Sequence, residues 1–191
     1  MRIVAGRFGG RRLAALGKGD PAAHLRPTSD RVRESLFSQL THLDVLDGAR
    51  VLDMFSGTGA LALEALSRGA EHAVLVENGR KAQGLIAENT RLTGTAQETT
   101  VLRRDATRIG VNPGDPCTLI FLDPPYGKGL GERAVAAAQA GGWIAPGACV
   151  VWEESQPIAP PPGFTLLDTR KHGDTYITLL RQDQNDETGD L

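Results

Sequence analysis

Residues 51–62 read VLDMFSGTGALA, a pattern that predicts a strand running into a glycine turn and then a helix. In an open parallel sheet, such a unit lies where ligands bind, outside the carboxyl ends of the strands. Gly57 and Gly59 suit this turn because a side chain there would keep a bound cofactor away from the backbone. The G-x-G-x-x-A spacing also occurs in dinucleotide-binding folds, so by itself it indicates a nucleotide-like cofactor without choosing one.

Short apolar runs alternate with helical segments on the carboxyl side of this stretch, which is typical of a parallel sheet covered on both faces. The expected strands are residues 50–54, 73–77, 99–103, 118–122 and 148–152, and the expected helices are 59–68, 79–91 and 129–141. Two further strands, 164–169 and 175–180, are too close together for a crossover helix, so they should pair antiparallel. The sequence therefore predicts an α/β, Rossmann-like fold with a seven-stranded, mostly parallel sheet and an antiparallel C-terminal hairpin.

The chain has 191 residues, of which 40% are hydrophobic and 23% charged, close to globular averages. No apolar run approaches the roughly 18 residues of a spanning helix, and the N-terminus lacks the apolar core of a signal peptide. We therefore expect a cytoplasmic protein without a membrane partner. Cys117 and Cys149 lie in apolar stretches and predict buried, reduced thiols. No metal site is expected, because ligand spacing is absent among His24, His42, His72 and His172.

The net charge of -2 averages two unlike segments. Residues 1–33 hold eight basic and two acidic side chains, a net charge of +6, which leaves -8 for the rest of the chain. This asymmetry indicates a polyanionic partner for the basic segment, although a solvated basic face without a partner is the alternative. The residues expected to bind RNA phosphates are Arg2, Arg7, Arg11, Arg12, Arg26, Arg31 and Arg33.

Three segments follow from these patterns. Residues 1–27 are expected to form a basic arm or small hairpin and a loop, and residues 28–181 the main domain. This domain should begin with a helix capped by Thr28 or Ser29. Residues 182–191 hold four acids and little apolar surface, so we expect a disordered tail.

An acidic residue lies at or just after the end of each of the first three predicted strands. Asp53 lies where a carboxylate suits a cationic amino-acid group better than a pyrophosphate. Glu77 closes the next strand, where an acid can accept both ribose hydroxyls, and Asp105 is placed to meet an adenine amino group. S-adenosylmethionine, which has an ammonium and a ribose but no phosphate, fits this set better than a nicotinamide dinucleotide does. The alternative is that Asp53 and Asp105 only cap the helices that follow them.

The segment FLDPPYG, residues 121–127, follows the fourth strand. Its two prolines restrict the backbone and hold Asp123 extended. An exocyclic amino group on a nucleobase is a poor nucleophile because its lone pair is delocalised into the ring. The Asp123 carboxylate and the Pro124 carbonyl can orient such an amine, while Tyr126 stacks on an unpaired or flipped base. The alternative is a strand-ending turn with an incidental tyrosine.

Three blocks of the sequence together resemble the RsmD family of bacterial 16S ribosomal RNA guanine-N2 methyltransferases. These blocks are RPTSDRVRESLF at 26–37, FSGTG at 55–59 and DPPY at 123–126, and the resemblance extends from the RIVAG segment at 2–6 to the strand near Tyr176. It implies a class I S-adenosylmethionine-dependent enzyme that methylates the 2-amino group of a guanine in 16S rRNA of the small ribosomal subunit. We expect this enzyme to be a monomer.

Carried over by position, the resemblance assigns residues to a cofactor site and to a catalytic loop. The implied cofactor-binding residues are Asp53, Phe55, Gly57, Gly59, Glu77, Asn78, Asp105 and Ala106. The implied catalytic loop consists of Asp123, Pro124, Pro125 and Tyr126. Asn78 departs from the family pattern, since relatives often have an acid there, which affects secondary ribose contacts but not Glu77. The block at residues 26–34 should lie near both cofactor and substrate.

Three alternative functions share parts of this sequence pattern. A DNA adenine-N6 methyltransferase uses a similar Asp-Pro-Pro-Tyr loop, but such enzymes generally need additional segments that read sequence. A non-catalytic rRNA-binding assembly factor on the same fold is disfavoured by the intact cofactor and proline loops. A nicotinamide oxidoreductase is disfavoured because the sequence supplies no clear proton donor for hydride chemistry.

Overall fold

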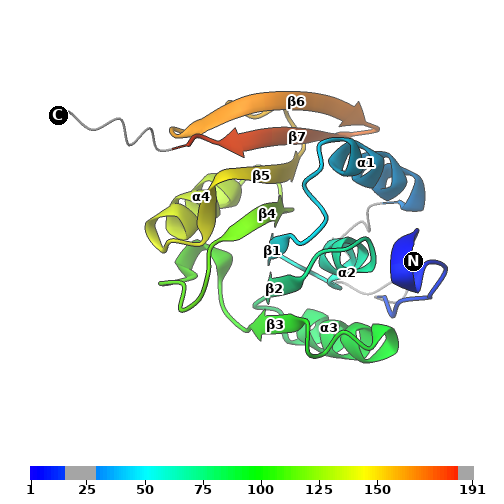
Figure 1. The fold of residues 1–191 in the computed structure, drawn as a ribbon. Coiled ribbons are helices and arrows are strands. Elements are labelled where there is room, and N and C mark those ends of the chain that lie inside the picture. Colours follow the sequence, from blue (N-terminus) through cyan, green and yellow to red (C-terminus); the bar gives the residue numbers. More distant parts are fainter. Residues whose placement is uncertain (16–28, 185–191) are drawn as a thin grey trace.

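The sheet at the centre of the protein has seven strands in the order β3-β2-β1-β4-β5-β7-β6 (Figure 1). The computed structural model describes residues 1–15 and 29–184. The strands are β1 (Arg50–Met54), β2 (His72–Val76), β3 (Thr99–Leu102), β4 (Cys117–Leu122), β5 (Ile144–Glu154), β6 (Phe164–His172) and β7 (Thr175–Gln182). The first five are parallel, and β7 runs antiparallel to both β5 and β6. The predicted fold, including its antiparallel hairpin, is confirmed.

Helices cover both faces of this sheet (Figure 1). They are α1 (Asp30–His42), α2 (Ala60–Ser67), α3 (Arg80–Thr93) and α4 (Leu130–Ala140), with short 3-10 turns η1 (Gly6–Phe8) and η2 (Ala106–Arg108). Apolar residues of α1, α2 and α3 share one core cluster with one face of the sheet, whereas α4 and η2 pack on the other face. Cys117 and Cys149 are buried as predicted, and burial raises the pKa of each thiol to about 11, which keeps it protonated.

The main departures from the expected element boundaries occur in the second half of the chain. β5 begins at Ile144 rather than at 148, because the segment that holds Pro146 and Gly147 is absorbed by a register shift against β4. β7 extends to Gln182, one residue into the segment predicted to be a tail. The rest of that tail prediction falls largely on residues 185–191, outside the described residues. In the described part of the chain, no helix is long and apolar enough to cross a membrane.

The N-terminal arm is part of the main core rather than an appendage. An antiparallel bridge joins Arg2 to Arg12, and the Ile3 N–H donates to the Arg11 carbonyl at 2.9 Å, so the predicted small hairpin is present. Ile3 and Leu13 are buried in the cluster that also holds α1 and α2. The arm therefore contributes apolar burial to the folded domain.

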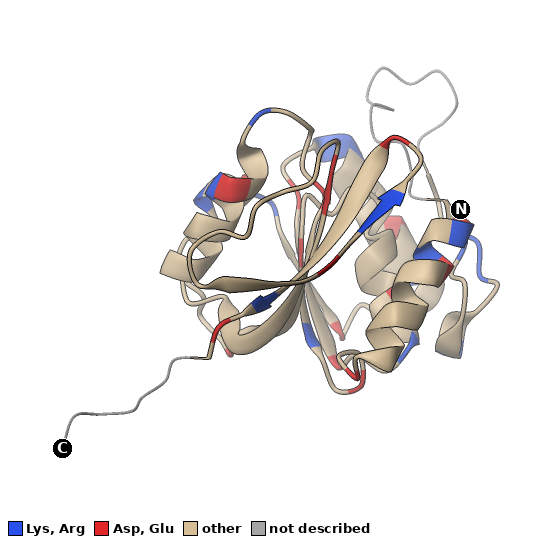
Figure 2. Cartoon of the chain, turned by 90° about the horizontal axis from the view of Figure 1, so that it is seen from above, with Lys and Arg blue, Asp and Glu red and all other residues tan. Residues whose placement is uncertain are grey.

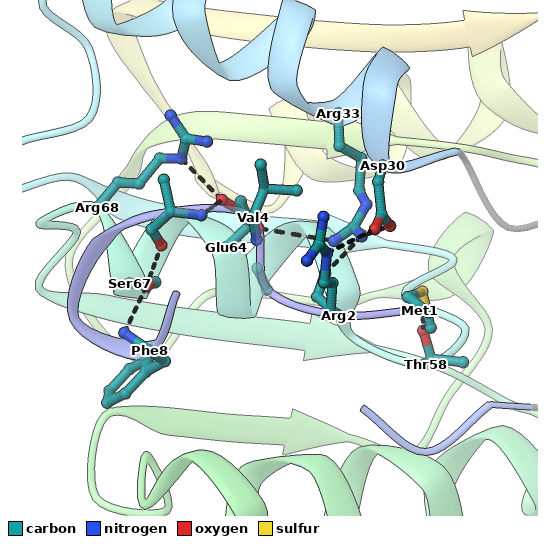
Figure 3. A network of polar contacts seen from close by, with 12 residues as sticks. Met1, Arg2, Val4, Phe8, Asp30, Arg33, Thr58, Glu64, Ser67 and Arg68 are labelled. Carbon is teal, nitrogen blue, oxygen red and sulfur yellow. Dashed lines mark hydrogen bonds and ion pairs between the residues drawn. The ribbon is translucent and has the colours of Figure 1, made fainter. Parts of the chain in front are cut away.

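Glu64 of α2 holds the arm in place (Figure 3). This side chain is fully buried, and its carboxylate accepts hydrogen bonds from Val4 N–H at 2.7 Å, Ala5 N–H at 3.0 Å and Arg68 Nε at 2.8 Å. The Arg33 guanidinium of α1 lies 3.6 Å from the same carboxylate. A buried carboxylate needs partners of this kind because its desolvation is costly. Glu64 therefore joins the arm, α1 and α2 into one unit.

The expectation that Arg33 binds RNA phosphates is not supported by its position. Its side chain is 1% exposed. Besides facing Glu64, its Nη2 atom donates to the Arg2 carbonyl at 2.5 Å and to Asp30 at 2.6 Å. The linear sequence cannot show this, because the partner carboxylate lies on another helix. Arg33 is a structural cation that compensates a buried acid.

We expect Glu64→Gln to lower the free energy of unfolding by about 3 kcal/mol, because it removes the buried counter-charge of Arg33 and leaves only the more exposed Asp30 to compensate that charge. Glu98→Gln is the matched control, since it removes the more exposed pairing with Arg7 and should cost less than about 1 kcal/mol. Urea unfolding of both variants measures this difference. Equal losses of stability would contradict the role given to Glu64.

Candidate functional site

The loop between β1 and α2 adopts the backbone that the glycine pattern predicts. Gly57 and Gly59 have φ values of 57° and 76°, in the left-handed region that favours glycine. A Cβ atom on Gly59 would lie 2.8 Å from the Leu75 side chain, which leaves no room for one. Phe55 also has a positive φ, 63°, without being glycine. Strained residues of this kind persist where the surroundings hold them and concentrate at functional sites.

Asp53 lies directly beneath this loop, at the end of β1. It is 2% exposed, and its carboxylate accepts a hydrogen bond of 3.3 Å from the Ala62 N–H in α2. Burial raises the pKa of Asp53 to about 7, the Ala62 hydrogen bond opposes this shift, and the negative charge of Glu77 adds to it. The helix-capping alternative accounts for the contact with Ala62, but no cation of the described residues contributes to the pKa shift of this buried carboxyl group.

Glu77 connects the glycine loop to the start of α3. Its carboxylate accepts hydrogen bonds from Gly57 N–H at 2.9 Å and from Gly79 N–H at 2.6 Å. Each oxygen keeps a further acceptor position, because a carboxylate offers about four lone-pair sites. Glu77 therefore organises two loops at adjacent strand ends and can still accept hydroxyl donors. Asn78, its neighbour, is exposed.

Asp105 caps the short turn η2 after β3. Its Oδ1 atom accepts hydrogen bonds from the Thr107 N–H and from the Thr107 hydroxyl, both at 2.8 Å. These two bonds hold the pKa of Asp105 below its usual value. The next residue, Ala106, is buried. The capping interaction thus occupies the Oδ1 atom of Asp105, and only the Oδ2 atom is left to accept a hydrogen bond from a cofactor.

The Asp-Pro-Pro-Tyr loop begins at the end of β4, which is paired with β1. The Asp123 N–H lies 3.5 Å from the Met54 carbonyl, so the loop starts beside the last residue of β1. Burial raises the pKa of Asp123 well above its usual value, and the negative charges of Glu153, Asp53 and Glu154 raise it further. The structure therefore brings Asp53 and Asp123, which are 70 positions apart in the sequence, into electrostatic contact.

Glu153 is a site residue that sequence reasoning missed. It lies near the end of β5, and its Oε1 atom accepts a 2.9 Å hydrogen bond from the Tyr126 hydroxyl. Tyr126 is 39% exposed as a residue, so the bond holds this tyrosine at the surface beside Asp123. The predicted order of the strands could have indicated Glu153, because a residue near the end of a strand parallel to β4 and next to it must lie near the loop that follows β4.

These acids together fit a cationic ligand. Asp53, Glu77 and Asp123 follow or end adjacent parallel strands, and among residues 1–15 and 29–184 the charged groups that shift the pKa values of Asp53 and Asp123 are all acidic. An ammonium group and ribose hydroxyls match such a set, whereas a pyrophosphate would be repelled by it. The residues present therefore fit S-adenosylmethionine better than a dinucleotide. No cluster of His, Cys, Asp or Glu that could hold a metal ion occurs among residues 1–15 and 29–184.

Most of the arginines assigned to RNA by sequence are engaged within the protein. Arg2 pairs with Asp30 at 3.0 Å, Arg7 pairs with Glu98, and Arg11 donates to a carbonyl at the end of α3. Arg12 and Arg31 are exposed, whereas Arg26 lies outside the described residues. Phosphate binding by the paired arginines would have to compete with these internal contacts.

Comparison with known proteins gives a consistent family. The family model described as "Conserved hypothetical protein 95" matches residues 1–181. The chain is 37% identical to "Ribosomal RNA small subunit methyltransferase D" of Escherichia coli (strain K12), over 98% of this chain and 93% of the relative. It is 31% identical to the Haemophilus influenzae protein of the same description, over 97% and 94%. A solved structure described as "Putative methyltransferase yhhF from Escherichia coli" superimposes with a TM-score of 0.83 at 34% identity, over 97% of this chain and 99% of that one.

The raised pKa of Asp53 predicts a gain in stability when its charge is removed. An acid whose pKa is about 7 when folded and 3.8 when unfolded loses stability as the pH rises between these values. Asp53→Asn, which keeps an acceptor for Ala62, should therefore raise the free energy of unfolding at pH 8 by up to about 4 kcal/mol.

The measurement is urea unfolding of the cofactor-free protein at pH 5 and pH 8. Asp115→Asn, on an exposed loop before β4, is the matched control and should leave the pH dependence unchanged. If Asp53→Asn keeps the pH dependence of the wild type, the ionisation assigned to Asp53 is wrong.

Proposed function

This chain belongs to the RsmD family, described as Conserved hypothetical protein 95, and from that premise we propose that it methylates the N2 amine of a guanine in 16S rRNA. S-adenosylmethionine is the proposed methyl donor. The proposed substrate is the small ribosomal subunit or its rRNA, and we expect a monomer that acts in the cytoplasm. The relatives support an rRNA methyltransferase over nearly the full length of the chain.

The observation that best supports this proposal is that two loops begin side by side at the same edge of the sheet. The glycine loop follows β1 and the Asp-Pro-Pro-Tyr loop follows β4, and these strands are direct neighbours in the sheet. The Asp123 N–H and the Met54 carbonyl, 3.5 Å apart, mark where the two loops start side by side. A methyl donor held by the first loop is thereby brought next to an amine held by the second.

Each proposed cofactor-binding residue would contact a different group of S-adenosylmethionine. When bound, S-adenosylmethionine supplies an electrophilic methyl group on a sulfonium. The Asp53 carboxylate would compensate the ammonium charge, and Glu77 would accept the ribose hydroxyls through its remaining lone pairs. The Oδ2 atom of Asp105, to which Thr107 does not donate, would accept a hydrogen bond from the adenine amino group. Gly57 and Gly59 keep side chains out of the way.

The residues of the catalytic loop act on the amine. The Asp123 carboxylate and the Pro124 carbonyl each accept one N–H of the guanine amino group, which turns its lone pair toward the methyl donor. Because the pKa of Asp123 is raised, its carboxylate is a stronger proton acceptor than an ordinary one, and it takes the proton that the amine loses. Tyr126, fixed through Glu153, offers its exposed ring to the face of the base.

We expect Asp123→Ala to lower methyl transfer by at least about 100-fold, because the amine loses both its orienting acceptor and its proton acceptor. The dissociation constant for S-adenosylmethionine should change by less than about twofold, with Asp115→Ala as the matched control. The assay follows labelled methyl transfer to unmethylated small subunits, naked rRNA and DNA in parallel.

Nucleoside analysis of the product completes this test. N2-methylguanosine in rRNA is the expected product. Methyladenine in DNA, or substantial turnover by Asp123→Ala, would contradict the proposal. A wild-type protein that binds rRNA without methylating any of the three substrates would indicate a binding factor instead.

The pH dependence of the reaction supplies a separate prediction. Asp123 must be ionised to accept a proton, so the turnover rate should rise with pH through the raised pKa of this carboxyl. Glu153→Gln removes a negative charge that raises this pKa, so the rising limb should move by about 0.5–1 pH unit toward lower pH. Tyr126→Phe separates the two effects of Glu153, because it removes the hydrogen bond but keeps the charge. A limb that does not move in Glu153→Gln would contradict the assignment.

A further inference from the structure

Exposed basic side chains surround the site at the edge of the sheet where the parallel strands end. They come from four segments: the first residue of α3, the chain after β3 and η2, the loop after Tyr126, and the first turn of α4. This basic rim consists of Arg80, Arg103, Arg108, Lys128 and Arg133, all of them exposed. Figure 2 shows a basic segment in the loop before α4 and, at the start of that helix, a basic segment beside an acidic one.

Part of this rim is fixed beside the site by contacts between η2 and α4. Arg133 lies 3.5 Å from the Thr107 hydroxyl, measured from its Nη2 atom. The positive charges of Arg108 and Arg133 both act on the Asp105 carboxyl and lower its pKa, which places all three groups close together. Lys128 follows Tyr126 by two positions, so it belongs to the loop that holds the amine.

Acids and bases at this edge differ in exposure. Asp53 is buried and Asp123 is partly buried, whereas the basic groups are exposed, with the exposed acid Glu132 beside Arg133 in the first turn of α4. The opposite edge, where the strands begin, presents the exposed acids Asp44, Asp47, Glu71 and Asp115 and the exposed base Arg91. Exposed charge is therefore mostly basic at the carboxyl edge of the sheet and mostly acidic at the opposite edge. Basic groups at the rim also serve no phosphate of the proposed cofactor, because S-adenosylmethionine carries none.

We propose that the basic rim binds the phosphates of the RNA strand on either side of the target guanine. This inference rests on the proposed function and names the surface that serves it. A base that enters the site unpaired leaves its flanking phosphates at the mouth of that site, where only positive charge at the surface can reach them. Contacts of this kind position the strand without reading its sequence.

The rim also has fewer competing contacts than the N-terminal arm. Arg2, Arg7 and Arg11 are held by internal partners, and Arg33 is buried. Arg103, Arg108 and Lys128 project from loops and short turns at the site itself. The chief phosphate-binding surface therefore lies around the carboxyl edge of the sheet rather than along the arm.

The test uses the full-length variants Arg103→Ala, Arg108→Ala and Lys128→Ala, with Arg91→Ala as the matched control. Arg91 is exposed in the last turn of α3, at the opposite edge, and its loss changes the net charge equally. Each rim variant should raise the KM for unmethylated small subunits about three- to tenfold at constant kcat. The slope of log affinity for rRNA against log salt should fall by about 0.7–1 per variant.

The dissociation constant for S-adenosylmethionine is measured for each variant. It should stay within about twofold of wild type. Rim variants that retain the wild-type KM and salt slope, or whose KM changes only together with cofactor affinity, would overturn the inference. A wild-type protein that does not methylate small-subunit rRNA would instead refute the proposed function, so the two failures are distinguishable.

Discussion

The burial of two carboxyl groups at neighbouring strand ends is the constraint on which the site depends. Asp53 is withdrawn from water and Asp123 partly so, and the charges of the described residues that shift their pKa values are those of other acids, so both resist ionisation. This arrangement costs stability in the cofactor-free protein. A cationic ligand relieves this cost at Asp53, because it supplies a counter-charge that none of the described residues supplies there. The cost at Asp53 thus favours binding of an ammonium group, and the raised pKa of Asp123 makes that carboxylate a stronger proton acceptor.

The rest of the fold keeps these acids in place. Glu64 and Arg33 form a buried pair on the face of the sheet that α1, α2 and α3 cover. This pair fixes the arm and α1 against α2, the helix that follows the glycine loop. Asn89 of α3 adds a second connection, since its side chain donates to the Thr58 carbonyl at 2.9 Å and accepts from the Ala14 N–H at 2.7 Å. The glycine loop is therefore held from below by Asp53 and from the side by the arm.

Sequence periodicity predicted the fold because strand and helix signals are local. The run at 50–54 coincides with β1, and Ser29 caps α1 as expected. The sequence could not assign partners to charges, because pairing depends on which elements the fold brings together. The sequence pattern therefore predicts RNA binding by Arg33, although this residue compensates the charge of Glu64. The basic rim does not stand out in the sequence, because its residues come from separate segments.

The most direct measurement is the number of protons released when S-adenosylmethionine binds, obtained by calorimetry at pH 6.5 in buffers of different ionisation enthalpy. With a pKa of about 7, Asp53 is mostly protonated in the empty protein and must ionise to pair with the ammonium. Binding should therefore release about 0.8 proton per cofactor, and Asp53→Asn should abolish most of this release while weakening binding. Binding without proton release, or release that is unchanged in Asp53→Asn, would contradict the account.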